Sequence, residues 1–356
     1  MYQIISSSEP TCIFSTKNLT TQTIESFPKT CTTVCSDIAI DEHCTLTEDQ
    51  LASTFMNMKH LVGSLIVIST KYTSLKFLVP LESIECGDYE IMIVLNPKLI
   101  ELGMSKLTTI KCSSISISNN KAMTKLNIPN LKNISASEFS ESNDTRVDLR
   151  IIYLDKNFCI TTQEMYNFMS SEDLHMDNLF GMHCEPAVPL TNGKVCNSSY
   201  TLVYPTNILD DCTQYFGSLV ILPENEKEVA KLKSVEMVFG PLYIARTNLT
   251  NIDFLGSLKY VSSLGYDTPP IKVENNRLLT NFTFPSLKRI KSSILSSWVV
   301  FENNSESLTL NPEFCSELQD QLSVNYKGSG ENEIQKSLRM LRLYVLQKTG
   351  IQGIPF

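Results

Sequence analysis

The chain has 356 residues, of which 42% are hydrophobic, so it can form two or three domains with real cores and is not disordered. Its net charge of -8 and the lack of a basic stripe exclude nucleic acid as a partner. Charged residues total only 19%, while Ser, Thr and Asn are abundant, which favours an extracellular surface over a cytosolic one.

Residues 1–30 are predicted to be an N-terminal extension. This stretch has no basic region followed by an apolar one, so it does not read as a signal peptide. No segment of the chain reaches the roughly 20 apolar residues of a membrane span. We therefore expect an incomplete ectodomain, joined to a membrane only through a segment outside this sequence.

A Leu-x-x-Ile/Val unit then recurs in two blocks of three. Its copies begin at Leu81, Leu107 and Leu131 in the first block and at Leu232, Leu258 and Leu287 in the second. A repeating unit of about 25 residues cannot bury its apolar face alone and has to stack on its neighbours. The pattern therefore predicts two stacks of coils in tandem.

Short runs with apolar residues two apart follow the units, and this spacing puts both side chains on one face of a strand. The predicted strands are Ile91–Ile93, Ile115–Ile117, Ile152–Leu154, Leu242–Ile244, Ile271–Val273 and Val299–Phe301. Entry strands at 63–67 and 217–221 precede the two blocks, each opening with Gly-Ser-Leu.

An Asn follows most of these strands at a fixed offset of three residues. These structural turn residues are Asn96, Asn120, Asn157, Asn276 and Asn304. Asn bonds the backbone of a turn through its side chain and tolerates left-handed conformations, and stacked Asn residues can bond one another. The fold class is accordingly mainly β, with two short right-handed β-solenoids in tandem.

The predicted domains are residues 31–170 and 196–326, separated by a polar linker at 171–195. A Ser/Asn/Glu-rich insertion at 135–146 lengthens one coil of the first domain. Residues 327–356 form a tail in which Ile334, Leu338, Leu341 and Val345 have the spacing of a short amphipathic helix.

The cysteines favour disulfides in an oxidising compartment, since 11 thiols would be unusual in a reducing one. Cys86 and Cys112 each lie two residues after the Ile of a repeat unit and so occupy the same place on adjacent coils. Coils stack about 4.8 Å apart, within the Cα separation of about 4.4–6.8 Å that a disulfide bridges. We predict a Cys86–Cys112 bridge, with two buried thiols as the alternative.

The remaining pairs are inferred from chain position: Cys196 with Cys212, Cys159 with Cys184, Cys44 with Cys31 or Cys35, and Cys12 with whichever of those two remains. Cys315 is then left unpaired, which again favours an incomplete chain. Cys31, Cys35, His43 and Cys44 also have the residue types of a zinc site, but their spacing matches no common one. No metal or cofactor is expected.

Seven Asn-x-Ser/Thr sequons support the secretory route, because each can accept a glycan there. They are Asn18, Asn133, Asn143, Asn197, Asn248, Asn281 and Asn303. Catalysis is not expected: no histidine lies at a triad spacing from Ser, Cys or Asp, and no phosphate-binding loop is present. The acidic residues fall mostly in turns and the linker rather than on strand faces.

The two blocks, each with Gly-x-Leu-x-Ile/Val strands, Leu-x-x-Ile coils and a terminal Phe-Cys, resemble the receptor L domains of the insulin-receptor and EGF-receptor families. The closest passage is 232–255, with a Gly-Pro-Leu-Tyr-Ile strand, an Asn turn and Phe-Leu. The tandem arrangement is similar to the nematode group of insulin/EGF-receptor-like L-domain proteins. The linker departs from those receptors, since it holds only Cys184 where they have a cysteine-rich module.

This resemblance implies a non-enzymatic extracellular or cell-surface protein that binds a secreted peptide or protein ligand, for instance an insulin-like or growth-factor-like one. A decoy without signalling is one form of that hypothesis, because no kinase is present. The alternative is a structural or adhesion protein of the extracellular leucine-rich-repeat type. The ligand-binding residues and the oligomeric state are not predicted by the sequence.

Overall fold

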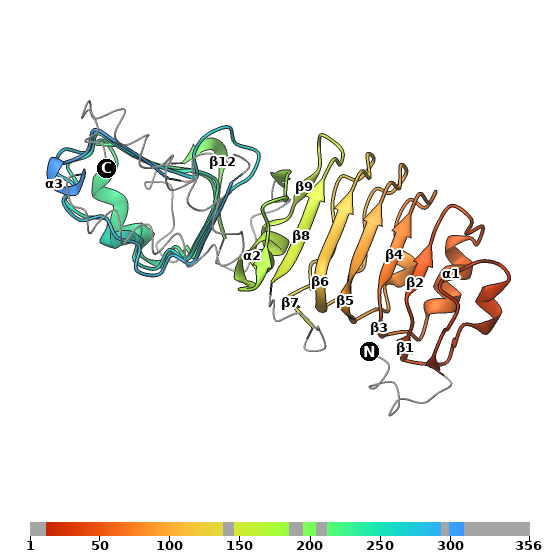
Figure 1. The fold of residues 1–356 in the computed structure, drawn as a ribbon. Coiled ribbons are helices and arrows are strands. Elements are labelled where there is room, and N and C mark those ends of the chain that lie inside the picture. Colours follow the sequence, from red (N-terminus) through yellow and green to blue (C-terminus); the bar gives the residue numbers. More distant parts are fainter. Residues whose placement is uncertain (1–11, 138–145, 185–194, 204–211, 293–298, 310–356) are drawn as a thin grey trace, which may run out of the picture. The chain divides into compact units, whose positions relative to one another are not determined.

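The computed structural model describes residues 12–137, 146–184, 195–203, 212–292 and 299–309, and the protein is mainly β. The chain divides into two compact units, residues 1–184 and 185–356 (Figure 1). Every strand pairing between the described strands is parallel, because the chain returns to the start of each coil before the next strand begins. The unpaired Cys315 of the prediction and the possible helix in the tail lie outside the described residues.

The first face of unit one contains one short strand from each coil. These strands are β1 (Thr33–Cys35), β3 (His60–Val62), the first part of β5 (Ser83–Val94), the first part of β6 (Thr109–Ser118) and β7 (Asn133–Ser135). One residue of each strand points inward and is buried, in the register Val34, Leu61, Ile84, Ile110 and Ile134. The three repeat units of the first block each supply a Leu three residues before one of the last three of these residues.

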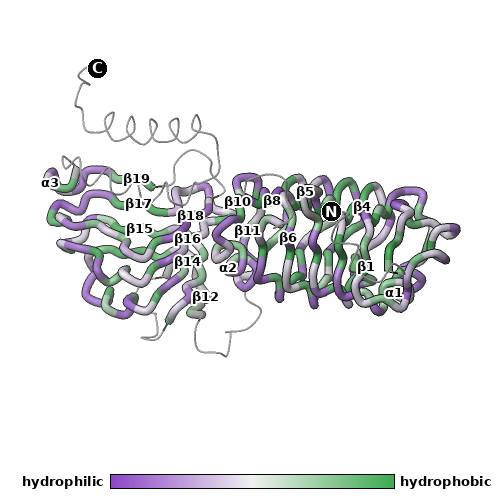
Figure 2. Tube along the Cα trace, turned by 60° about the horizontal axis from the view of Figure 1, so that its bottom comes forward, coloured by the Kyte–Doolittle hydropathy of each residue, from purple (hydrophilic) through white to green (hydrophobic). Residues whose placement is uncertain are grey.

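The second face follows after a bend in the chain. It contains β2 (Ile38–Ile40), β4 (Leu65–Ile68), the second halves of β5 and β6, β8 (Val147–Ile152) and β10 (Leu174–His175). Apolar residues two apart point inward, as in Ile91 with Ile93 and Ile115 with Ile117, and they are 1–4% exposed. Figure 2 shows hydrophobic residues along these strands and hydrophilic ones in the turns.

Glycine allows the bend between the two faces. Gly63 lies between β3 and β4 with φ +139°, in a backbone region that other residues rarely adopt. A Cβ built there would lie 2.0 Å from the carbonyl oxygen of Ser36 on the neighbouring coil. The Gly of the repeated Gly-Ser-Leu sequence therefore marks a position where two backbones are in contact.

A third side without long strands closes each coil. The amide of Ile100 donates to the carbonyl of Thr73 at 2.8 Å, and the amide of Thr124 donates to the carbonyl of Ile100 at 3.0 Å. The Leu residues that open the repeat units end this side and are buried, including Leu81 and Leu107 at 0% exposure. The other elements are η3 (Thr23–Ser26), α1 (Glu48–Phe55), η4 (Lys76–Leu78), β9 (Cys159–Ile160), α2 (Thr162–Ser170) and β11 (Met182–His183).

Both α-helices of unit one begin with a capping box, which satisfies amides that a helix start leaves open. Thr47 and Gln50 form it in α1, and Thr161 and Glu164 form it in α2. Glu164 is buried, and its second oxygen accepts the amide of Ile128 at 2.8 Å, so the cap also ties α2 to an earlier coil. Residues 171–184, which the sequence places in a linker, form β10 and β11 and belong to this unit.

Unit two repeats the design. One face contains β14 (Met237–Phe239), β16 (Tyr260–Ser263) and β18 (Arg289–Ser292), and the other contains β15 (Leu242–Ala245), β17 (Ile271–Glu274) and β19 (Val299–Glu302). The strand β13 (Gln214–Ile221) spans both faces and pairs with β12 (Val195–Val203). Short helices are η6 (Glu226–Ser234), η7 (Asp253–Leu255) and α3 (Glu306–Thr309). The rings of Phe282, Phe284 and Phe301 pack edge to face in the core of unit two.

A buried ladder of amide side chains runs down the corner after the second face of unit one. Asn96 Oδ1 accepts both the amide and the hydroxyl of Thr70, at 2.9 and 2.7 Å. Asn120 Oδ1 accepts the amide of Asn96 at 2.9 Å, and Asn96 Nδ2 donates to the carbonyls of Val67 and Val94. Both Asn residues are 0% exposed, so each rung bonds the next coil as well as its own turn.

Unit two contains the same ladder, again headed by a threonine. Asn276 Oδ1 accepts the amide and the hydroxyl of Thr247, and Asn304 Oδ1 accepts the amide of Asn276 at 3.0 Å. The left-handed residue of each turn is the one before the rung: φ is +60° at Leu95 and +59° at Asn275. The rung residues themselves do not have positive φ. The two roles predicted for Asn, bonding the turn and adopting the left-handed conformation, therefore belong to two neighbouring residues.

Asn157 corrects the prediction of five equivalent Asn turns. It is exposed, and its amide bonds Asp155 in the local turn instead of a rung. The strand register explains the difference: Ile117 pairs with Ile151, so the inward pair of β8 is Leu149 and Ile151, not Ile152 and Leu154. The position equivalent to Asn120 is then Leu154, which has no side-chain amide. The ladder therefore ends one coil early.

Candidate ligand-binding surface

Isoleucine and methionine side chains point outward from the second face of unit one. Along β4 and β5, Ile66 and Ile68 alternate with buried neighbours, as do Met92 and Val94. Ile66 lies opposite Met92 and Ile68 lies opposite Val94, so the four side chains form one continuous group. We call this group the apolar surface. All four are partly exposed, although the solvent side of such a strand is ordinarily polar.

Polar residues continue the same rows toward the end of the unit. Met92 pairs with Ser116 and Ser116 with Arg150, while Ser114 pairs with Asp148. Arg150 and Asp148 are exposed. An apolar centre with a polar rim is the usual anatomy of a protein–protein interface.

The corresponding rows of unit two are charged instead. Tyr243 lies opposite Lys272, and Tyr243 Oη donates to Glu274 Oε1. Lys272 Nζ lies 2.8 Å from Glu274 Oε2 and 5.8 Å from the centre of the Tyr243 ring. Burial and the hydrogen bond to Glu274 raise the pKa of Tyr243 to about 12, while Lys272 holds the pKa of Glu274 below its usual range. These groups satisfy one another, so this face has no apolar centre of the same kind.

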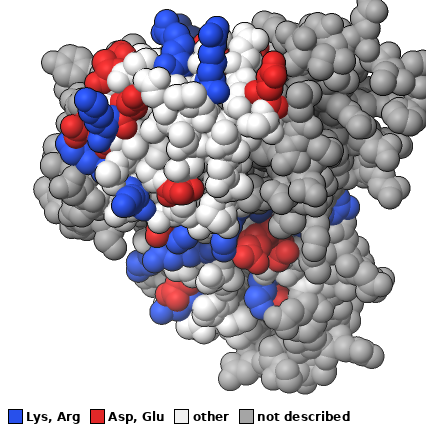
Figure 3. Space-filling view, turned by 90° about the vertical axis from the view of Figure 1, so that its left-hand side faces the viewer, with Lys and Arg blue, Asp and Glu red and all other residues white. Residues whose placement is uncertain are grey.

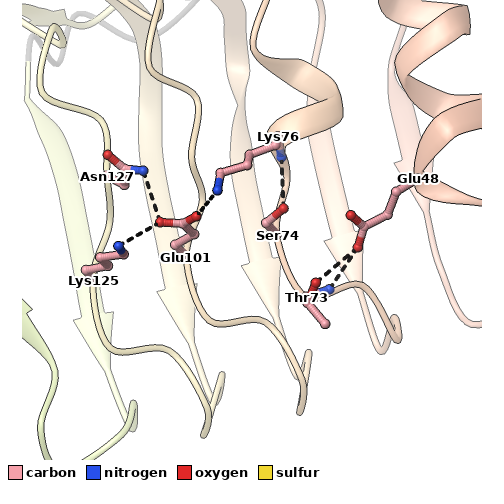
Figure 4. A network of polar contacts seen from close by, with 7 residues as sticks. All are labelled: Glu48, Thr73, Ser74, Lys76, Glu101, Lys125 and Asn127. Atoms are coloured by element: carbon pink, nitrogen blue, oxygen red, sulfur yellow. Dashed lines mark hydrogen bonds and ion pairs between the residues drawn. The ribbon is translucent and has the colours of Figure 1, made fainter.

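A buried carboxylate joins three coils on the third side of unit one (Figure 4). Glu101 Oε1 lies 2.6 Å from Lys76 Nζ, and Oε2 lies 3.3 Å from Lys125 Nζ and accepts Asn127 Nδ2 at 3.0 Å. Burial alone would raise the pKa of Glu101, but the hydrogen bonds from Lys76, Lys125 and Asn127 outweigh it and lower the pKa. Nearby, Glu48 Oε1 accepts the amide of Thr73 at 3.2 Å.

Four disulfides link eight of the ten cysteines in the described residues. Their pairs are Cys12–Cys31, Cys86–Cys112, Cys159–Cys184 and Cys196–Cys212. The predicted bridge from Cys44 to Cys31 or Cys35 is wrong: Cys44 is a thiol whose Sγ accepts a hydrogen bond from Tyr72 Oη at 3.3 Å, and Cys35 is a buried thiol. Sequence spacing alone did not distinguish the two possible partners of Cys12.

The family model described as Receptor L domain matches residues 30–128 and 211–326, which is more than half of the chain and falls once in each unit. The chain belongs to the receptor L-domain family. No curated protein matches it. The first match ends at residue 128, yet the coils of the first L domain continue through β8 and β10 to Cys184. This family is a non-enzymatic binding domain that typically binds protein or peptide ligands, and with its disulfides it indicates an extracellular domain.

The sequons of the two L domains lie at the surface where the structure describes them. Exposed side chains are Asn18, Asn133, Asn248, Asn281 and Asn303. Asn143 and the side chain of Asn197 lie outside the described residues. Asn133 opens β7 on the first face, so a glycan there would cover that face and leave the apolar surface uncovered. Glycosylation of these sites stays a prediction.

Two histidines of the first L domain, His60 and His175, lie beside polar side chains of other strands or turns. His60 Nδ1 lies 2.8 Å from Ser83 Oγ, but the two are simply cross-strand neighbours. His175 lies between Asp148 and Asp177, and the carboxylate of Asp177, 3.2 Å from its Nε2, raises its pKa despite burial. Among the described residues, no group of three His, Cys, Asp or Glu could hold a metal ion.

Two further surface properties concern partners of the L domains. On the described part of the face in Figure 3, Lys and Arg are interspersed with Asp and Glu among uncharged residues, and neither sign dominates. The described part of this face therefore contains no continuous basic track of the kind that nucleic acid requires. No helix within the described ranges is both long and apolar enough to cross a membrane.

Proposed function

We propose that this protein is a receptor-ectodomain-like or decoy-like binding protein that captures a secreted peptide or protein ligand on the apolar surface of its first L domain. The observation that supports the proposal is the outward group of Ile66, Ile68, Met92 and Val94 on a rigid sheet. Contiguous exposed apolar residues on a soluble protein mark interaction sites. The family's usual choice of peptide or protein ligands is consistent with it.

The shape of the surface favours a folded ligand over a single extended strand. The strands that present the group are paired on both sides, β4 with β2 and β5, and β5 with β4 and β6, so they offer no open edge for strand addition. A ligand would therefore contact side chains, and the flexible side chain of Met92, between Ile66 and Ser116, can adapt its shape to the contact. The likeness to the nematode group and the insulin-like or growth-factor-like nature of the ligand remain predictions.

The test is to titrate purified insulin-like and growth-factor-like peptides against the full chain, made through a secretory pathway, by surface plasmon resonance. Met92→Arg should weaken binding by at least tenfold, because a buried unpaired charge in an interface costs about 2 kcal/mol or more. Ser83→Arg, on the first face, is the matched control and should bind like the parent. Equal affinity of both variants for a bound peptide would contradict the proposal.

A further inference from the structure

A row of lysines follows the corner of the first L domain, one in each of four successive coils. Its members are Lys71, Lys98, Lys121 and Lys156. Each comes one or two residues after Thr70, Asn96, Asn120 or Leu154, the positions that the ladder and its register make equivalent. The lysines thus occupy the line of turns that follows β4, β5, β6 and β8 (Figure 1). We call them the lysine row.

These four ammonium groups are available to a partner. All four side chains are exposed, and none forms an ion pair with another described residue. Lys76 and Lys125 lie on the adjoining third side and share the single carboxylate of Glu101 (Figure 4). That cluster therefore leaves one excess positive charge beside the lysine row.

Few carboxylates oppose these charges. Asp155 lies in the same turn as Lys156, where it accepts the amide of Asn157, and Glu48 lies next to Thr73 at the N-terminal end. The turn after β2, one coil before Lys71, contains Asp41 and Glu42, so carboxylates flank the lysine row at that end. Within the four turns of the row, one carboxylate, Asp155, faces four lysines, in a chain whose net charge is -8. The excess of positive charge is therefore local to this corner.

The coil itself does not require lysine at these positions. In the second L domain, the residues that directly follow the rungs Thr247, Asn276 and Asn304 are Asn248, Arg277 and Ser305. Asn248 is a sequon residue, so that corner is expected to carry a glycan. The same fold thus tolerates a different surface, and the lysine row is a property of the first L domain alone.

We propose that the lysine row binds a linear sulfated polysaccharide of the heparan-sulfate type. Adjacent coils lie about 4.8 Å apart, so the four turns span roughly 14 Å in a line, which suits an extended polyanion. Lysine is a compact, strongly hydrated point charge and pairs with sulfate without the planar geometry that arginine imposes. An anionic lipid surface is the less favoured partner, because such lipids face the cytoplasm whereas the disulfides indicate an extracellular domain.

The lysine row lies apart from the proposed ligand site. The apolar surface consists of strand residues such as Met92, whereas the lysine row lies in the turns that follow those strands. A receptor domain that holds a sulfated polysaccharide at one corner would be retained at the cell surface or matrix with its apolar surface accessible. Loss of peptide binding would leave polysaccharide binding intact, and the reverse also holds.

The experiment measures binding of the full chain to heparin, by affinity chromatography and by titration at about 0.15 M salt, where exposed charges are partly screened. The variant Lys71→Gln/Lys98→Gln/Lys121→Gln/Lys156→Gln removes the lysine row. The control variant Lys17→Gln/Lys29→Gln/Lys106→Gln/Lys132→Gln removes the same charge from exposed positions of the same domain. Equal thermal midpoints of the two variants establish that both are folded.

We expect the parent and the control to be retained on heparin, and the lysine-row variant to bind at least tenfold more weakly. Desulfated heparin should compete poorly, and affinity should fall steeply with salt. Failure of the parent to bind heparin, or equal weakening in both variants, would overturn the proposal. Stronger binding to phosphatidylserine vesicles than to heparin would overturn it in favour of a membrane partner.

Discussion

Among single residues, the buried asparagines form the most specific hydrogen bonds between coils. An Asn side chain offers an acceptor and two donors, which is what a turn between stacked coils needs on both sides. Asn96 uses all of them, accepting from Thr70 and donating to the carbonyls of Val67 and Val94. A buried polar group that keeps every partner stabilises the fold, whereas one that loses them destabilises it.

Replacing Asn96 with Leu should lower the free energy of unfolding of the first L domain by about 3 kcal/mol, because the buried amide of Thr70 would lose its acceptor and the carbonyl of Val67 would lose a buried donor. Asn157→Leu is the matched control, since Asn157 is exposed and should lose less than about 0.5 kcal/mol. Urea unfolding followed by circular dichroism measures both. Equal losses in the two variants would disprove the ladder's role.

At the scale of elements, the coils depend on attachment to their neighbours rather than on their own length. Strands such as β3 and β7 contain three residues each, too few to be stable alone. Backbone bonds, the Asn ladder and the Cys86–Cys112 bridge each join β5 to β6 at a different place around the coil. The bridge is fully buried where both strands bend, so it acts inside the core.

The double variant Cys86→Ala/Cys112→Ala should lower the free energy of unfolding by about 3 kcal/mol, since the bridge closes a loop with a sequence separation of 26. Cys44→Ala should change it by less than about 1 kcal/mol. Tyr72 Oη would still donate to the carbonyl of Leu46 at 2.8 Å after that change. Thermal unfolding of both variants under non-reducing conditions measures the two losses. Equal stability of the double variant and Cys44→Ala would contradict a stabilising role of the bridge.

At the scale of the whole molecule, one architecture appears twice with different surfaces. Each L domain has its own core, its own Thr-Asn-Asn ladder and its own disulfide at an edge. The outward rows differ, because Ile66 and Met92 occupy the first domain where Tyr243 and Lys272 occupy the second. Inward positions are constrained by packing and outward ones are free to specialise.

A fragment of residues 1–184 should therefore fold without the rest of the chain. It keeps the Cys159–Cys184 bridge and every strand pairing of its sheet. Its far-ultraviolet spectrum should show β structure, and its thermal transition should be cooperative, with a midpoint within a few degrees of one transition of the full chain. A fragment that stays unfolded would show that its core needs the second L domain.

The repeat period predicts some features of this fold and not others. The Leu and Ile of the repeat units, the strands at 91–93 and 271–273 and the adjacency of Cys86 and Cys112 could be predicted, because a short period fixes which side chains point inward and which coils touch. Asn157 was placed wrongly, since the insertion before β8 shifts the register by an amount that local pattern does not reveal. Cys44 was mispaired because a disulfide depends on distance in space, not along the chain.

The repeat period predicts a tandem of stacked coils, because a short coil can bury its apolar face only against its neighbours. The period does not predict which outward residues gather into the apolar surface or which turns align into the lysine row; these follow from the three-dimensional arrangement of the coils. Strand register sets both, and register follows from the hydrogen bonds between coils. Residues as distant in sequence as Lys71 and Lys156 become the two ends of one row along a corner only through that stacking.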